Sequence, residues 1–256
     1  MKIKLDAAKS LESNAEIYFE LAKKAKRKIA GTEEAIEKLK EKLEKFKKEE
    51  VKEQKKVEKV ERKKEWYEKF HWFFSSEGFL CIGGRDATSN EIVIKKHTDK
   101  EDLVFHTDIA GSPFFVIKSE GKKVGEATMK ETAQAAAVYS RAWKAGISTV
   151  EVFMINPEQV SKEAKAGEYM AKGAFMIYGK KLKHFNPDLK LAIGIKDNRI
   201  IGGAADAVKK NADKSVIVIQ GKGKTSAVAK KIQKKLKGGD LDDIIRMLPA
   251  GGCEIS

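Results

Sequence analysis

The sequence predicts a mixed α/β (α+β) globular domain with a mixed sheet, preceded by a long N-terminal α-helical coiled-coil arm. Residues 6–70 are rich in Ala, Glu, Lys and Leu, and no proline occurs before Pro113. Beyond them, strand-like runs come first in a cluster and later alternate with helical segments. The 256 residues suffice for one sizeable domain and an appendage. We therefore expect a helical arm over 1–70 and a globular α/β domain over 71–256.

The arm carries a heptad pattern. Apolar residues follow alternating steps of four and three from Leu11 to Phe46, which is typical of a coiled-coil seam. The phase meets polar residues near 50–53 and recovers at Val57 and Val60. Such a seam needs a cover: a return arm, the globular domain or another chain.

Two arm geometries compete at Gly31. Basic residues before it and Thr32 with acids after it indicate a helix end and a new start, and hence a hairpin. The heptad phase, however, crosses Gly31 without a slip, which favours one continuous helix in which the glycine costs about 1 kcal/mol. The apolar gap at 49–56 would then be the tip of the arm.

An aromatic cluster follows at 66–73, and we expect it to hold the arm onto the domain rather than to stack on bases. Strands are predicted at 79–83, 91–96, 103–107 and 114–118, then at 150–155 and 173–178. Two further strands over 189–201 turn at Asp197-Asn198, and a buried strand lies at 216–220. Helices are predicted at 128–144, 204–210 and 226–236.

The composition points to a polyanionic partner. The net charge is +14, of which residues 1–70 account for +6 and residues 71–256 for +8. A surface of this kind favours RNA, DNA or an acidic membrane face, although lysine-rich chains also exist without such a partner. Cys81 and Cys253 form neither a disulfide framework nor a metal site, so we expect no cofactor. The sequence shows no long apolar run and no signal-like segment, and we expect a cytoplasmic protein that does not enter membranes.

Polar residues gather where two predicted strands end. Arg85, Asp86 and Asn90 follow the first strand, and His106 and Asp108 lie two positions apart at the third. A histidine with a carboxylate beside it could carry acid–base chemistry. The alternative is a polar binding surface knitted together by hydrogen bonds. Because there is no second histidine at ligand spacing, no serine elbow and no paired cysteine, we predict no catalytic residue.

Residues 216–226 present a strand, a glycine–lysine loop and a helix start. The loop lacks the glycine that a P-loop needs, so it is too short to wrap a triphosphate. Lys222 and Lys224 could still receive one backbone phosphate, and the alternative is a basic tight turn. Dispersed cations, with Trp143 and Tyr169 as exposable rings, would suit recognition of folded RNA by shape and backbone.

Several blocks resemble the NFACT family, and above all its C-terminal NFACT-R domain. They include Gly83-Gly84-Arg85-Asp86-Ala87, Asn90-Glu91, the His106/Asp108/Gly111 cluster and Gly173-Ala174-Phe175-Met176. Residues 5–28 look like the start of the family's coiled-coil arm, while His71 and Tyr178 stand where arginine is expected. The large N-terminal domain of the family has no counterpart here, so the chain would be a fragment or a reduced relative.

The resemblance implies a ribosome-associated quality control factor that binds obstructed large ribosomal subunits. It would help to position tRNA for untemplated C-terminal tailing of stalled chains. Its expected partners are tRNA and large-subunit RNA, and possibly a protein or a second chain through the arm. A nucleic-acid- or nucleotide-processing enzyme centred on His106/Asp108 and a coiled-coil interaction module remain alternatives. The candidate RNA-binding residues are Arg85, Asp86, Asn90, Lys95, Lys96, His106, Asp108, Lys118, Lys130, Arg141, Lys172, Lys222 and Lys224.

Overall fold

The structure, a computed structural model, describes residues 3–54, 64–163 and 170–256. It divides the chain into two compact units, Met1–Lys63 and Lys64–Ser256. The boundary lies seven residues before the predicted one, because the 3₁₀ helix η1 (Trp66–Lys69) packs with the globular unit.

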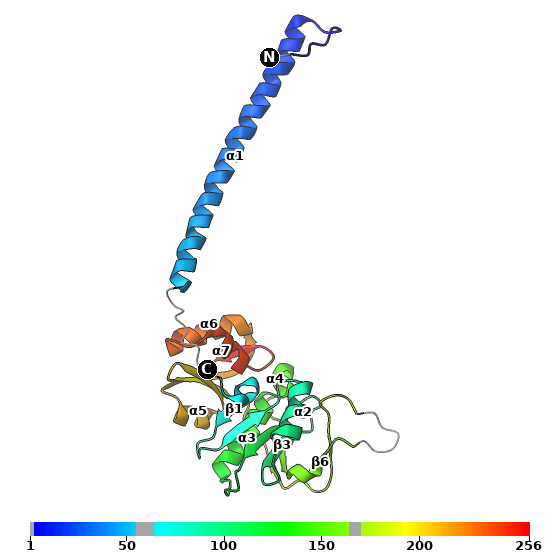
Figure 1. Ribbon diagram of the computed structural model, residues 1–256, viewed down its shortest axis with the longest axis vertical. Helices are drawn as coiled ribbons and strands as arrows, with labels where there is room; N and C mark the ends of the chain where they lie inside the picture. Colours follow the sequence, from blue (N-terminus) through cyan, green and yellow to red (C-terminus); the bar gives the residue numbers. More distant parts are fainter. Residues whose placement is uncertain (1–2, 55–63, 164–169) are drawn as a thin grey trace. The chain divides into compact units, whose positions relative to one another are not determined.

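The first unit is built on one helix, α1 (Leu11–Gln54), which runs through Gly31 without a break (Figure 1). The hairpin alternative at Gly31 is therefore wrong. The residues before α1 fold back onto its first turns: Asp6 N–H donates to the side chain of Asn14 at 2.8 Å, and the Tyr18 hydroxyl donates to the Lys4 carbonyl. The predicted seam residues Val57 and Val60 lie outside the described residues, as do residues 55–56 of the predicted tip, while residues 49–54 of that tip are still helical.

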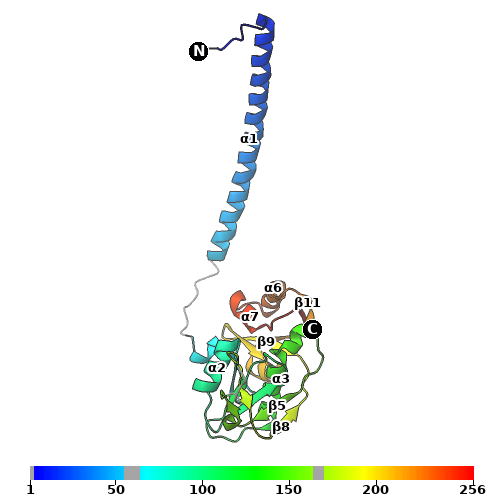
Figure 2. The same cartoon turned by 90° about the vertical axis from the view of Figure 1, so that its right-hand side faces the viewer.

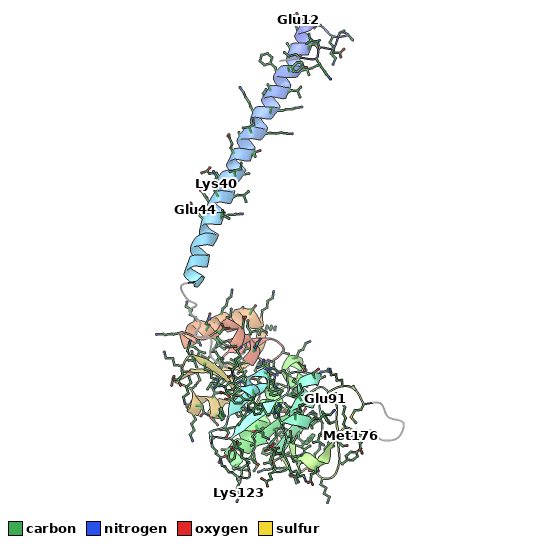
Figure 3. The ribbon with its side chains drawn as sticks, in the orientation of Figure 1. Glu12, Lys40, Glu44, Glu91, Lys123 and Met176 are labelled. Carbon is green, nitrogen blue, oxygen red and sulfur yellow. The ribbon has the colours of Figure 1, made fainter. Side chains whose placement is uncertain are left out.

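The seam of α1 is exposed within the part of the arm that the structure describes. The seam residues Leu11, Ile29, Leu39 and Leu43 all keep more than half of their surface in contact with solvent. Charged side chains such as Glu12, Lys40 and Glu44 project from the same helix (Figure 3).

The second unit is a mixed α/β domain, which confirms the predicted fold class, but its described sheets are antiparallel and not mixed as predicted. Its larger sheet has six strands in the order β1-β2-β4-β3-β5-β8, and every neighbouring pair is antiparallel. The strands are β1 (His71–Phe74), β2 (Leu80–Gly83), β3 (Leu103–Thr107), β4 (Phe115–Lys118), β5 (Val152–Ile155) and β8 (Lys183–Phe185).

A second antiparallel sheet has the order β10-β9-β11-β12. Its strands are β9 (Leu191–Lys196), β10 (Arg199–Gly203), β11 (Lys214–Gly223) and β12 (Cys253–Ile255). The predicted turn at Asp197-Asn198 joins β9 to β10, and both residues have positive φ, as a tight hairpin turn requires. The helices of this region are α5 (Ala205–Asn211), α6 (Thr225–Leu236) and α7 (Leu241–Met247), with α6 and α7 side by side (Figure 2).

The predicted strand at 91–96 is wrong, because these residues form α2 (Ala87–Lys96). The helix begins at a capping box. The side chain of Asp86 accepts a hydrogen bond from the backbone N–H of Ser89 at 2.7 Å, and the Ser89 hydroxyl accepts one from the backbone N–H of Asp86. The alternation of isoleucine and valine over 92–94 is typical of a strand, but the capping box decides in favour of a helix.

The predicted helix at 128–144 is two helices, α3 (Glu126–Val138) and α4 (Arg141–Ala145). Ser140 separates them, and its hydroxyl accepts the backbone N–H of Ala142 at 3.1 Å as a new N-cap. A small two-stranded ladder, β6 (Val160–Ser161) with β7 (Met176–Ile177), and the 3₁₀ helix η2 (Pro157–Gln159) complete the described elements.

Small side chains bring α3 close to the larger sheet. Ala133, Ala136, Ala137 and Val138 are fully buried, and α3 contacts β3, β4 and β5. Alanine at these positions lets the helix backbone approach the strands, so no room remains for a larger group.

The aromatic cluster at the start of this unit joins the same core. Tyr67, Phe70, Trp72 and Phe73 are buried, while Trp66 stays 45% exposed and stacks on His97 with 4.4 Å between ring centroids. Most of these rings are thus packed away from solvent, as expected of a structural cluster. Among the described residues, no helix has both the length and the apolar composition needed to cross a membrane.

We predict that Ala136→Leu lowers the free energy of unfolding by about 1–3 kcal/mol, because the added carbons overpack the contact between α3 and the sheet. Urea denaturation measures this change. The matched control is Ala127→Leu on the exposed side of the same helix, which should change stability by less than about 0.5 kcal/mol. Equal effects of the two substitutions would contradict the packing argument.

Candidate nucleic-acid interface

The candidate site is centred on the turn between β3 and β4, residues 108–113, called here the hairpin turn. Gly111 has φ +78°, and the Ser112 hydroxyl lies 2.6 Å from that of Thr107 and donates to the Ile109 carbonyl at 2.7 Å. These bonds close within a few residues, so the turn is rigid before any ligand arrives.

Asn90 ties the start of α2 to this turn. Its side-chain oxygen accepts the backbone N–H of Phe114 at 3.2 Å, and its amide donates to the Ser112 carbonyl at 3.4 Å. Gly84 packs so closely on the same amide that a Cβ there would lie 1.8 Å from Asn90 Oδ1. Asn90 is buried, and its polar groups are occupied by the protein itself. Its contribution to binding is therefore through the shape of the site.

His106 is held in the same manner. Its ring stacks on Phe114 at 4.0 Å, and its Nε2 lies 3.2 Å from the Ser112 carbonyl. Since a carbonyl only accepts, Nε2 carries the proton. Burial lowers the pKa of His106 from 6.5 to about 4, so the ring is neutral at pH 7 and brings no positive charge to a phosphate.

Asp108 is paired rather than free. Lys181 Nζ lies 3.1 Å from each of its carboxylate oxygens, and the same ammonium sits 3.8 Å from the ring centroid of Phe153. On the other side of the turn, a Cβ on Gly111 would lie 2.8 Å from Arg141 Nε. The hairpin turn is therefore flanked by two cations, Lys181 and Arg141.

Glu91 joins Lys162 and Gly173 to α2. Its carboxylate accepts from Lys162 at 2.7 Å and from the Gly173 N–H at 3.1 Å, with Lys95 at 3.7 Å. The hydrogen bond from Lys162, followed by that from Gly173, lowers the pKa of Glu91 to about 2. Gly173 itself, at φ +80°, packs against Ala87, which leaves no space for a side chain.

Arg85 has a different environment from its neighbour Asp86. The Asp86 carboxylate caps α2. The backbone hydrogen bond from Ser89 lowers the pKa of this carboxylate, and the positive charge of Lys172 contributes to the same effect. The Arg85 guanidinium faces Tyr139 and the α7 residues Asp243 and Arg246, and burial lowers its pKa. Its Nε is buried without a hydrogen-bond partner, and no carboxylate of the described residues forms an ion pair with it. It is thus a partly desolvated cation available to an anion.

The remaining candidates lie apart from the turn. Lys118 forms ion pairs with Asp99 at 2.7 Å and with buried Asp102, and its side chain is only 12% exposed. This bridge joins the end of β4 to the β3 side of the sheet and leaves the ammonium little access to a ligand. Lys130 is exposed near the first turns of α3, and Lys96 is exposed at the end of α2. Lys95 borders the Glu91 pair already described.

The glycine–lysine loop near Lys222 is part of β11 and not a cradle. The Lys222 N–H donates to the Glu254 carboxylate at 3.0 Å, and Gly221 and Gly223 pack on Glu254 and Cys253 of β12. A phosphate would meet a carboxylate there, so the geometry favours the tight-turn alternative for Lys222 and Lys224. Tyr169, one of the two rings expected to be exposable, lies outside the described residues, and Trp143 is buried with its Nε1 bonded to the Gly252 carbonyl at 3.1 Å.

Sequence reasoning missed Lys162, Lys181 and Phe175 as parts of the site. Lys181 follows Gly179 in a basic run, and Lys162 follows a short strand, but neither pattern says which strand end they reach. Their positions depend on the pairing of β5 with β8 and of β6 with β7.

The described residues offer little for metal or thiol chemistry. They contain no group of three or more His, Cys, Asp or Glu side chains that could hold a metal ion. Both cysteines are buried thiols, and burial raises the pKa of Cys81 to about 12, so this thiol stays protonated at neutral pH.

A rigid turn with flanking cations and a partly desolvated arginine is the arrangement expected of a module that binds a polyanion. Residues 69–179 match the family model described as the NFACT protein RNA binding domain. The Archaeal Rqc2 homolog aRqcH of Methanocaldococcus jannaschii is 43% identical over 199 residues, 75% of this chain and 30% of that protein. The Ribosome quality control complex subunit NEMF homolog of Drosophila melanogaster is 36% identical over 198 residues, 75% and 20%.

The chain belongs to the NFACT family. It spans less than a third of the length of these two relatives. Among solved structures, the C-terminal part of the fibronectin/fibrinogen-binding protein of Streptococcus suis aligns over 51% of this chain and 48% of that chain, with a TM-score of 0.40 and 19% identity. A similarity of that size transfers neither fold nor function.

We predict that His106→Gln flattens the dependence of stability on pH between about 6.5 and 4. Between these values the unfolded chain binds more protons at this residue, because its pKa is near 6.5 unfolded and about 4 folded. The contribution of His106 to the free energy of unfolding is fully present above pH 6.5. It is lost as the pH falls toward 4, and the loss is about 3 kcal/mol at most. Denaturant unfolding of both proteins from pH 7 to 4.5 measures it, and equal slopes would contradict the assignment.

Proposed function

We propose that residues 64–256 bind structured RNA at the hairpin turn, with Arg85 and Arg141 meeting backbone phosphates. The observation that carries this proposal is that the RNA-binding family model, over residues 69–179, covers the hairpin turn together with Arg85 and Arg141. Phosphate contacts of this kind fix the position of an RNA without reading its bases.

The wider role we propose is that of a ribosome quality control factor. Relatives with 36–43% identity are named as an Rqc2 homolog and as a homolog of a ribosome quality control complex subunit. On this basis the chain would act in the cytoplasm on large ribosomal subunits, and it would help to position tRNA during untemplated extension of a stalled nascent chain. The ribosome would form the peptide bonds, so the chain itself would act by binding.

The geometry supports binding over catalysis at His106 and Asp108. A general base for neutral pH needs a pKa near 7, whereas burial brings that of His106 to about 4. Asp108 is directed to Lys181 and does not orient the imidazole through a hydrogen bond.

A protein-binding role for the arm is supported by a separate observation. The described part of α1 carries apolar residues at heptad spacing that stay exposed, including Leu39 and Leu43. A helix of this kind is stabilised by packing against another helix, so we propose that the arm takes a protein partner or a second chain.

The RNA proposal is tested by measuring binding of the whole chain to deacylated tRNA, duplex RNA and duplex DNA across a salt series. We expect a preference for tRNA that survives near-physiological salt, because a rigid site recognises shape as well as charge. Equal binding to all three that collapses as salt rises would mean lysine–phosphate attraction alone and would contradict the proposal.

The same assay locates the site. Arg85→Ala, Arg141→Ala and Lys130→Glu should each weaken tRNA binding several-fold and make the salt slope shallower by about one. Lys40→Ala, on the exposed face of α1, is the matched control and should have less effect. If the arm substitution weakens binding as much as the three others, the site is elsewhere.

A further inference from the structure

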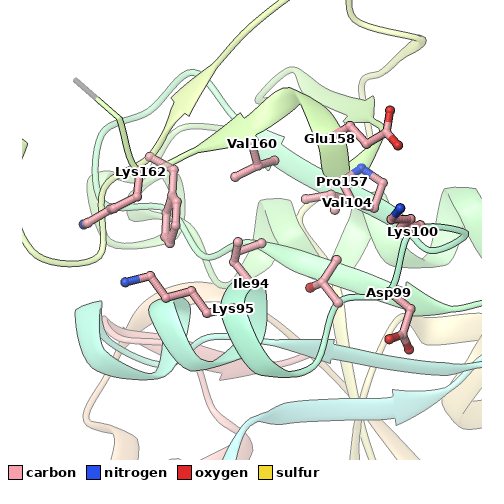
Figure 4. Close-up of a pocket in the computed structure, with 11 residues that line it drawn as sticks. Ile94, Lys95, Asp99, Lys100, Val104, Pro157, Glu158, Val160 and Lys162 are labelled. Carbon is pink, nitrogen blue, oxygen red and sulfur yellow. The ribbon is translucent and has the colours of Figure 1, made fainter. Parts of the chain in front are cut away.

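A cleft of about 330 Å³ opens between α2 and the β6/β7 ladder, next to the hairpin-turn site (Figure 4). Ile94 on α2 and Val160 on β6 point toward one another across it, with Val104 and Phe175 also in the lining. Its walls are therefore aliphatic and aromatic. Its polar groups lie around the rim.

The cleft is held open by the bonds that build the site. Lys162 donates to Glu91 on α2 and also to the carbonyls of Ala171 and Ala174 at 3.1 and 3.0 Å. Its ammonium further lies 5.0 Å from the ring centroid of Phe175. All three donors of Lys162 are thus used by the protein. Lys162 therefore fixes the distance between the segment that carries Phe175 and helix α2.

The volume limits what the cleft can hold. Small-molecule pockets run from roughly 300 to 1,000 Å³, so this cleft is at the lower end and takes one flat ring system with its sugar. Two opposed aliphatic side chains form a slot, and the face of a nucleobase fits a slot of that kind.

The charges at the rim match a nucleotide within a chain. Such a nucleotide has a phosphate on either side, and the cleft has Lys95 at one end and Lys100 at the other (Figure 4). Lys100 forms no ion pair within the part of the chain that the structure describes, and Lys95 shares Glu91 with Lys162. Glu158 also borders the cleft, with its carboxylate directed outward from the rim in Figure 4. Turned over the rim by rotation of its side chain, this carboxylate would accept a hydrogen bond from the amino group of cytosine, adenine or guanine.

We propose that this cleft binds one unpaired nucleotide of the RNA. Its base lies between Ile94 and Val160, its two phosphates meet Lys95 and Lys100, and its amino group donates to Glu158. The inference rests on the proposed RNA-binding function and adds to it a preference for an unpaired base, stronger when the base carries an amino group. Recognition of folded RNA would then combine phosphate contacts at the hairpin turn with one base taken out of the stack.

The experiment compares three otherwise identical RNA duplexes: fully paired, with one bulged cytosine, and with one bulged uracil. The whole chain should bind the cytosine bulge about fivefold to tenfold more tightly than the paired duplex, in line with the stacking of a single base. The affinity for the uracil bulge should lie between those for the cytosine bulge and the paired duplex, because uracil lacks the amino group.

Two cleft variants and one control complete the design. Val160→Trp fills the slot and should remove the preference for a bulge while leaving affinity for the paired duplex unchanged. Glu158→Ala should bring the cytosine bulge to the level of the uracil bulge. Leu39→Trp, a similar enlargement at an exposed position of α1, should keep the wild-type preferences.

The outcomes separate the two proposals. If the wild type binds all three RNAs equally, the cleft does not hold a nucleotide, although RNA binding stands. If it binds none of them at near-physiological salt, the proposed function itself fails and the inference fails with it. Retention of the bulge preference by folded Val160→Trp also overturns the inference, because the unpaired base would then be bound elsewhere.

A second measurement covers the case in which Val160→Trp does not fold. A 4-thiouridine placed at the bulge and irradiated on the wild-type chain should crosslink to peptides that contain 94–100 or 157–162. Crosslinks confined to other peptides would overturn the proposal.

Discussion

The buried amide of Asn90 is the interaction on which the candidate site depends. It bonds to both ends of the segment 112–114 and packs under Gly84, so one side chain joins β2, the start of α2 and the hairpin turn. A buried amide that loses its partners costs about 1–3 kcal/mol, which makes this arrangement strongly preferred over any other register of the turn. The stacking of His106 on Phe114 and the bond from His106 to Ser112 both follow from it.

The electrostatics of the site separate structural cations from available ones. Lys118, Lys162 and Lys181 each meet a carboxylate, and their main effect is to join segments. Arg85 forms no ion pair with a carboxylate in the part of the chain that the structure describes, and exposed Arg141 lies over Gly111. A domain with a large net positive charge thus exposes only part of that charge near the site, and this favours recognition of a shaped polyanion over general attraction.

The heptad phase across Gly31 predicted the continuous α1 correctly, because a single exposed glycine costs little beside an unbroken seam. The turn at Asp197-Asn198 was also predicted correctly from the sequence, because Asp and Asn tolerate positive φ. Of the polar candidates at the ends of β2 and β3, Asn90 and His106 both bond to Ser112 in the hairpin turn, whereas Arg85 has a different environment. In contrast, the prediction of a strand at 91–96 was wrong. It gave more weight to the isoleucine–valine run than to the helix-capping signal of Asp86 and Ser89.

What the sequence could not show is which polar groups the protein uses for itself. Asn90 and Lys118 look like ligand contacts in the sequence, yet one is buried in the fold and the other is bound to Asp99 and Asp102. That distinction depends on antiparallel pairings between segments far apart in the chain, which residue spacing does not encode. Lys181 is the converse case, because it reaches Asp108 only through the pairing of β5 with β8.

The most direct test of the account is hydrogen–deuterium exchange of the whole chain with and without tRNA. The account predicts slower exchange in the hairpin turn, in 141–147 and in 171–181, with little change in α1 and in the loop around Lys222. Protection confined to α1 or to α6, with the hairpin turn unchanged, would contradict the assignment of the RNA-binding surface.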